Sequence, residues 1–130
     1  MTAPTPTADA EQTTTVAIGR GEFLKGHASA IEKLVRAMSR AEQCIRSRPE
    51  ESLNLIAEWL KIDVDALRPQ WKQFDFRVNL LQSQLITQEN EARCAMARGH
   101  AADGPVPNFL PHLYLDALLA VQPERVTVLR

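Results

Sequence analysis

The sequence has little cysteine, few aromatic residues and almost no net charge, and each shortage excludes a class of protein. Cys44 and Cys94 belong to no CxxC pattern, so neither a zinc knuckle nor a disulfide framework is indicated. The 15 basic residues nearly cancel the 16 acidic ones, which excludes a protein that binds nucleic acid through net charge alone. The longest apolar run, residues 117–121, is far shorter than the roughly 18–20 residues of a membrane helix. Composition leaves a soluble, mostly helical domain.

Residues 1–13 differ in composition from everything that follows. They consist largely of Thr, Ala and Pro, which is typical of a disordered tail. They have neither a basic start nor an apolar stretch, so the sequence predicts no secretory signal. Residues 14–130 are the expected folded domain, and the alternation over residues 14–18 indicates at most a short strand.

Helical periodicity is the strongest signal in the folded part. A long amphipathic helix is predicted over residues 28–47. Its apolar positions are Ile31, Leu34, Val35, Met38, Ala41 and Ile45. Pro49 suits the first turn of a second helix, for which Ser47 and Glu50 fit a capping box.

Three further helices are expected after the second one. Asp63 is expected to cap a short helix that Pro69 should kink or end. Another helix is predicted over residues 83–98, with Gly99 ending it, and a last short one over residues 113–121. The loop between these last two, around residues 103–111, contains three prolines and a glycine.

Two segments have the period of a strand. Residues 74–80 alternate apolar and polar side chains, and residues 126–129 predict a terminal strand. The fold class expected is therefore α/β but helix-rich, with about five helices and two or three short strands. Isolated strands make a poor sheet, and unpaired edges favour association with other strands. These strands are expected to belong to a sheet whose other members are absent.

Histidine and acidic residues that could act in catalysis or metal binding are present, but they form no recognisable motif. His27, His100 and His112 lie near turns and helix ends, and no metalloprotease or nucleophile motif surrounds them. Glu89 and Glu91 predict a solvated helix face, since metal binding requires ligands from several elements. The sequence thus predicts no enzyme, no catalytic residue, no metal and no cofactor.

One basic segment has the local charge that could favour binding to nucleic acid. Residues 20–48 hold seven basic residues against three acidic ones, a local excess of four. The apolar positions of residues 56–67 resemble those of a helix-turn-helix, but Asp63, Asp65 and Pro69 oppose DNA by charge and shape. We therefore interpret the basic segment as a solvated face, with no nucleic-acid partner.

Several segments, in their order and spacing, resemble the C-terminal part of the substrate-binding proteins of nitrate/sulfonate/taurine-type ABC importers. The resemblance covers about residues 16–130, and no single motif is diagnostic. Its segments are Glu22-Phe23-Leu24-Lys25-Gly26-His27, residues 45–52, Phe76-Arg77-Val78, residues 106–109, residues 114–116 and residues 123–128.

This resemblance implies the C-terminal portion of a periplasmic-binding-protein type II-like fold, from a two-lobed protein that closes on a small ligand. The implied function is the solute-binding component of an ABC importer for a small anionic or organic ligand, present as a fragment, with the permease as partner. No ligand contact can be carried over from the family, because most residues of its ligand cleft belong to the missing lobe. Arg77 and Asn108, polar residues among apolar neighbours, are the candidates for ligand contact, and structural roles are favoured over ligand contact for both. The family implies a periplasmic location, although a chain without a signal peptide would stay in the cytoplasm.

Two other functions stay open at this point. The first is a freestanding helical interaction or dimerisation domain that uses the face from Ile31 to Ile45 for a partner or a second copy. The second is an enzyme related to pyrimidine-precursor synthesis, which shares the binding-protein fold. No residue favours the enzyme specifically, and the oxidation state of Cys44 and Cys94 also stays open.

Overall fold

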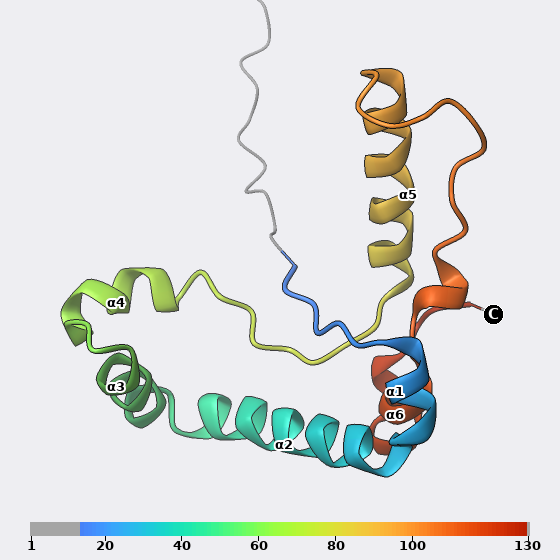
Figure 1. The fold of residues 1–130 in the computed structure, drawn as a ribbon. Helices are drawn as coiled ribbons and strands as arrows, with labels where there is room; N and C mark the ends of the chain where they lie inside the picture. Colours follow the sequence, from blue (N-terminus) through green and yellow to red (C-terminus); the bar gives the residue numbers. More distant parts are fainter. Residues whose placement is uncertain (1–13, 130) are drawn as a thin grey trace, which may run out of the picture.

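The described structure, a computed structural model, covers residues 14–129 and is built from helices joined by extended segments (Figure 1). The predicted tail over residues 1–13 and the last residue lie outside the described residues. In chain order the elements are α1 (Gly21–Gly26), α2 (Ala28–Ser47), α3 (Pro49–Leu60), α4 (Val64–Trp71), α5 (Gln82–Ala97), the 3-10 helix η1 (Leu110–His112), α6 (Asp116–Val121) and the 3-10 helix η2 (Pro123–Arg125).

The predicted fold, a helix-rich α/β portion of a periplasmic-binding-protein type II-like fold, is wrong. Residues 14–129 are 64% helical and contain no strand, so the expected strands at 14–18, 74–80 and 126–129 do not form. The only β pairing among these residues is one isolated parallel bridge between Leu80 and Val126. It consists of the Leu80 N–H donating to the Arg125 carbonyl at 3.0 Å and the Thr127 N–H donating to the Leu80 carbonyl at 2.9 Å.

The segment before this bridge shows why the alternation of apolar and polar residues predicted a strand that does not form. Phe76 and Val78 are half-buried while Asp75 and Arg77 are exposed, so the two-residue period of burial exists as the sequence suggests. A strand, however, also needs a neighbouring strand for its backbone groups. Here the Val78 N–H donates instead to the Glu42 carboxylate at 2.9 Å. The segment is extended but is not part of a sheet.

The helix predictions are largely confirmed. The helix expected over residues 28–47 has those bounds in α2, α3 begins at Pro49 as expected, and the Asp63 side chain caps α4 by accepting from the Asp65 N–H at 2.7 Å. The helix expected over residues 83–98 spans residues 82–97, the one expected over 113–121 begins at Asp116, and α1 was not predicted. Pro69 lies inside α4, which ends two residues later. The capping box of Ser47 and Glu50 is wrong, because Arg48 is the N-cap residue of α3 and no side chain accepts there.

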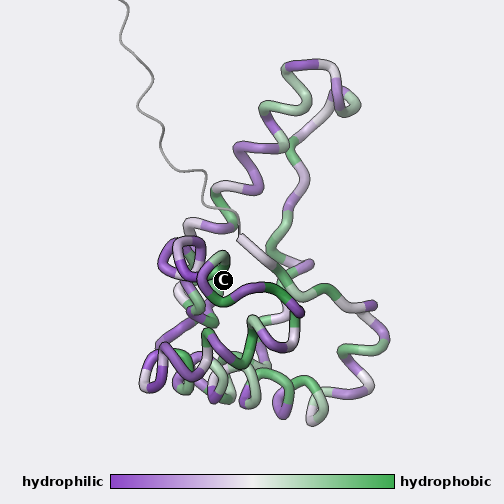
Figure 2. The backbone as a smooth tube through the Cα atoms, turned by 90° about the vertical axis from the view of Figure 1, so that its left-hand side faces the viewer, coloured by the Kyte–Doolittle hydropathy of each residue, from purple (hydrophilic) through white to green (hydrophobic). Residues whose placement is uncertain are grey.

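The elements form an open arrangement around α2. In Figure 1, α3 and α4 lie at one end of α2, α1 and α6 at the other, and α5 stands away from the rest. The view turned by 90° also shows α5 projecting, with hydrophobic and hydrophilic residues mixed along it (Figure 2). Within residues 14–129, no helix is both long enough and apolar enough to cross a membrane.

Two separate clusters of buried side chains replace a single core. Leu53, Ala57 and Leu67 join α3 to α4, and a second cluster forms around Leu85, Leu115 and Val128 near the other end of α2. The apolar positions of α2 stay half-buried or exposed, since its one buried residue is Glu42. Much apolar surface is therefore left open. The large hydrophobic residues exposed within the described part are Val16, Ile18, Phe23, Leu34, Met38, Leu55, Trp59, Leu60, Ile62, Phe74, Ile86 and Leu129.

Lys61 is in a backbone conformation that favours glycine. It ends α3 in the left-handed region with φ 56°, and its N–H bonds to the Glu58 carbonyl. The corresponding residue after α5 is Gly99, with φ 72°. Because a side chain in this region is strained, Lys61→Gly is expected to raise the free energy of unfolding by about 0.5–1 kcal/mol. Urea unfolding would measure the gain. Lys61→Ala is the control, since it keeps the strained Cβ and should give no gain.

Candidate functional site: the hollow around Glu42

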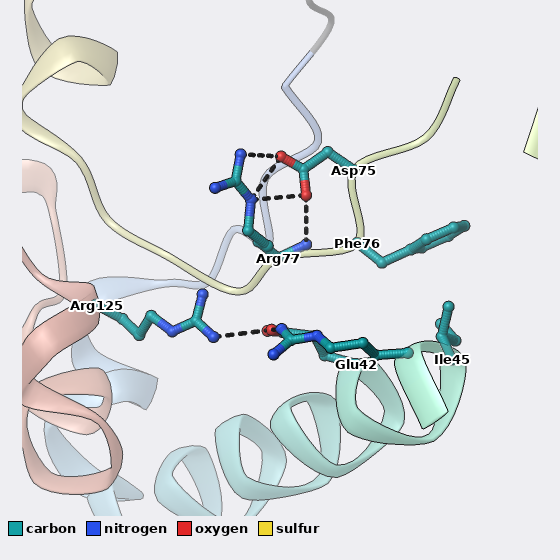
Figure 3. A pocket seen from close by; sticks show the side chains of 7 residues that line it. Glu42, Ile45, Asp75, Phe76, Arg77 and Arg125 are labelled. Atoms are coloured by element: carbon teal, nitrogen blue, oxygen red, sulfur yellow. Dashed lines mark hydrogen bonds and ion pairs between the residues drawn. The ribbon is translucent and has the colours of Figure 1, made fainter. Parts of the chain in front are cut away.

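A shallow hollow of about 490 Å³ lies where the C-terminal part of α2 meets the extended segment before α5 and the short helix η2 (Figure 3). Residues from three parts of the chain line it. They are Glu42, Ile45, Arg46, Asp75, Phe76, Arg77 and Arg125.

Glu42 holds these three parts together. Its side chain is only 6% exposed. One carboxylate oxygen accepts from Arg46, one turn further along α2, and from Arg125 at 2.9 Å, while the other accepts from the Val78 N–H. A buried carboxylate is tolerated only when charged or polar donors replace water in this way. Glu42 therefore positions both the extended segment and η2 against α2.

Asp75 and Arg77 form a second ion pair at the rim. The Arg77 Nε donates to both Asp75 oxygens, at 2.8 and 2.7 Å, and the guanidinium makes a further short contact with the same carboxylate. The hydrogen bond from the Arg77 side chain holds the pKa of Asp75 below its ordinary value of 3.8. A carboxylate with a lowered pKa stabilises the fold above that ordinary value, and the contribution is lost as the pH falls through the lowered pKa. Both side chains are more than half exposed, so this contribution is small.

The hollow has a surplus of positive charge. Its lining carries three guanidinium groups against two carboxylates, which leaves one positive charge. Each guanidinium has five N–H donors, and the hydrogen bonds to Glu42 and Asp75 use only some of them. Arg46 and Arg77 are 64% and 60% exposed. The free N–H groups can donate hydrogen bonds to the oxygens of a small anion. The residues that line the hollow include no Ser, Cys, His or Lys that could act as a nucleophile or base.

Of the two predicted ligand residues, only Arg77 lines the hollow. Asn108 lies in the loop before η1, where its side-chain oxygen accepts from the Leu110 N–H at 3.1 Å, so it stabilises a turn. The sequence interpretation missed Glu42, Arg46 and Arg125 as members of a site. A signal existed for Glu42, because it lies seven residues after Val35 and three before Ile45, at an apolar position of the helix.

The remaining candidates stay apart from the hollow. The His27 ring stacks on Phe23 with centroids 4.2 Å apart, and its Nδ1 lies 2.9 Å from the Phe23 carbonyl. Cys44 and Cys94 are both free thiols. Glu89 pairs with Arg93 on the surface of α5. Among the described residues, no three His, Cys, Asp or Glu side chains gather into a group that could hold a metal ion.

Comparison with known proteins finds no relative: no protein-family model, no curated protein and no solved structure matches this chain. The likeness to importer substrate-binding proteins therefore depends on the order of the segments described above, and it stays a prediction.

Proposed function

We propose that this chain acts as part of the solute-binding component of an ABC importer, and that the hollow around Glu42 holds the charged end of a small anionic solute. The observation that carries the proposal is the surplus of guanidinium groups in the hollow. Arg77, a candidate for ligand contact because it is polar among apolar neighbours, is one of the three. Planar guanidinium groups present paired N–H donors that match nitrate, sulfonate and carboxylate oxygens.

The open apolar surface also supports this proposal. Ile18 is 93% exposed, Leu129 75% and Phe74 58%, and the bridge at Leu80 has no neighbour on either side. Exposed apolar patches of this kind mark surfaces that another part of a protein covers. In the proposed protein, a ligand-enclosing partner lobe covers them. The enzyme of pyrimidine-precursor synthesis stays a prediction that no structural observation favours.

The proposal is tested by anion titration of the chain followed by NMR. Nitrate, methanesulfonate and taurine are added at constant ionic strength, and the signals of the Arg77 Nε–H and the Val78 amide are recorded. We expect saturable shifts at both positions, because both groups adjoin the hollow. Arg77→Ala should weaken the apparent affinity at least about tenfold, since one charge-assisted donor group is lost.

The matched control is Arg93→Ala. Arg93 is also exposed and ion-paired, with Glu89 on α5, but it lies outside the hollow. Its loss should leave the affinity unchanged. Shifts that grow linearly without saturation for all three anions, or equal losses in both variants, would contradict anion binding in the hollow.

A further inference from the structure

Helix α2 carries an apolar stripe that the rest of residues 14–129 leaves partly open. Leu34 is 51% and Met38 40% exposed, and Ala41 is exposed on the same side. Their spacing of four and three residues places them in one line along the helix. Helix α6 packs against α2, and Gln122 just after it accepts from Ser39, so α6 covers a different side from this stripe.

One edge of this stripe is basic. Lys33 and Arg40 lie beside it, seven residues apart, and both are exposed. Neither has an ion-pair partner among the described residues. Two solvated cations beside an open apolar stripe are complementary to an apolar surface with acidic groups along its edge.

Helix α3 has such a surface. Leu55 is 66% and Trp59 80% exposed, one turn apart, on the side of α3 that does not contribute to the cluster with α4. Glu51 and Glu58 border them, also seven residues apart. Glu58 has no ion-pair partner within residues 14–129, and Glu51 has only a contact of 3.4 Å with Arg48.

The two surfaces match in register as well as in charge. On both helices, the charged edge lies on the same rotational side of the apolar residues, so an antiparallel crossing brings the two edges together and a parallel crossing separates them. Seven residues span about 10.5 Å in each helix. Lys33 then faces Glu58 while Arg40 faces Glu51.

We propose that a second copy of this chain covers these surfaces. In the resulting symmetric dimer, α2 of each copy packs antiparallel against α3 of the other copy, so that the same contact forms twice. Taking about 180 Å² for an exposed Leu, 200 Å² for Met and 250 Å² for Trp, the four apolar side chains offer roughly 500 Å² per copy. The pair then buries about 1,000 Å² of apolar surface, close to the roughly 900 Å² in a standard-size interface.

Contacts between α2 of one copy and α3 of the other are more favourable than contacts between two α2 stripes or between two α3 surfaces. Two α2 stripes that crossed antiparallel would bring Lys33 and Arg40 against the same cations, and two α3 surfaces that crossed in this way would oppose their glutamates. A parallel crossing of like surfaces avoids this repulsion, but it pairs no opposite charges. Like charges placed across an interface oppose association. An anionic lipid surface would suit α2 but not the acidic edge of α3.

Charge reversal tests the pairing by sedimentation equilibrium. One variant carries Lys33→Glu and Arg40→Glu, and the other carries Glu51→Lys and Glu58→Lys. We expect the unaltered chain to form a dimer and each variant alone to associate at least about tenfold more weakly. An equimolar mixture of the two variants should form a dimer again, because each reversed edge then meets its complement. Circular dichroism checks that both variants keep their helices.

The control exchanges an ion pair outside the proposed interface, with Glu89→Lys and Arg93→Glu on α5, and it should dimerise like the unaltered chain. A chain that stays monomeric at every concentration would overturn the proposal. So would dimers in both variants alone, a mixture that stays monomeric, or binding of the unaltered monomer to phosphatidylserine vesicles in place of dimerisation. The anion titration concerns residues outside these edges, so either proposal can fail while the other stands.

Discussion

Glu42→Ala is expected to lower the free energy of unfolding by about 2–4 kcal/mol, although the residue lies in no active-site motif. The reason is that one buried carboxylate satisfies donors from three parts of the chain: Arg46 on its own helix, Arg125 and the Val78 N–H. Alanine leaves the Val78 N–H without its acceptor and places two guanidinium groups side by side without their counter-charge. The extended segment should then detach from α2.

Urea unfolding measures the loss, and hydrogen exchange locates it. The Val78 amide should exchange much faster in Glu42→Ala, because the carboxylate that accepts its hydrogen bond is gone. Glu89→Ala is the control, since Glu89 makes a single surface ion pair with Arg93 at 3.6 Å, and its loss should stay within about 0.5 kcal/mol. Equal effects of the two substitutions would show that Glu42 does not hold the segment.

The hollow could be predicted from the sequence only in part. Arg77 attracts attention because it is a charged residue between two apolar neighbours. Its neighbours in the hollow come from far away along the chain: Glu42 contacts Val78 across 36 residues and Arg125 across 83. Periodicity within one helix can show that Glu42 occupies an apolar position, but it cannot show which donors meet it there. That information lies in the tertiary contacts.

The long helices α2 and α5 could be predicted to within one residue, because their signals are local, whereas α1 was not predicted and α6 begins three residues later than expected. A run of apolar residues at helical spacing, Pro49 at a first turn and the cap at Asp63 each act within a few residues. The capping box failed because Ser47 continues α2 and donates its hydroxyl to the Cys44 carbonyl at 3.3 Å, so it is not free to cap α3. The capping box was therefore expected to begin one residue before Arg48, which is the N-cap of α3.

The strands failed for the opposite reason. Alternation over residues 74–80 reports which side chains turn inward, and the burial of Phe76, Val78 and Leu80 agrees with it. Whether an extended segment becomes a strand depends on a partner elsewhere. Within residues 14–129 the only such partner is Val126, opposite Leu80. The period of two therefore predicted the partial burial of these three residues but not the exposure of Phe74, which is 58% exposed, and it predicted the hydrogen bonding wrongly.

The division into two clusters leads to the second large prediction, for Leu53. This residue is 1% exposed and is the most buried side chain of the cluster between α3 and α4. Leu53→Ala removes its contacts and leaves a cavity, which costs about 3 kcal/mol. Because the cluster around Leu85 is separate, we expect α3 and α4 to unfold first while the second cluster keeps its stability.

Both tryptophans, Trp59 and Trp71, lie in this helix pair, so tryptophan fluorescence reports its unfolding. It also reports the start of the extended segment, because the Trp71 ring lies 4.7 Å from the Phe76 ring, but nothing in the cluster around Leu85. In Leu53→Ala the fluorescence transition should move to lower urea, whereas slow amide exchange at Leu118 in α6 should be unchanged. Leu55→Ala, two residues along the same helix but 66% exposed, is the control and should cost less than about 0.5 kcal/mol in dilute, monomeric protein. If Leu53→Ala accelerated exchange at Leu118 as much as it shifted the fluorescence, the two clusters would be one cooperative unit, and the open arrangement around α2 would not describe how this protein unfolds.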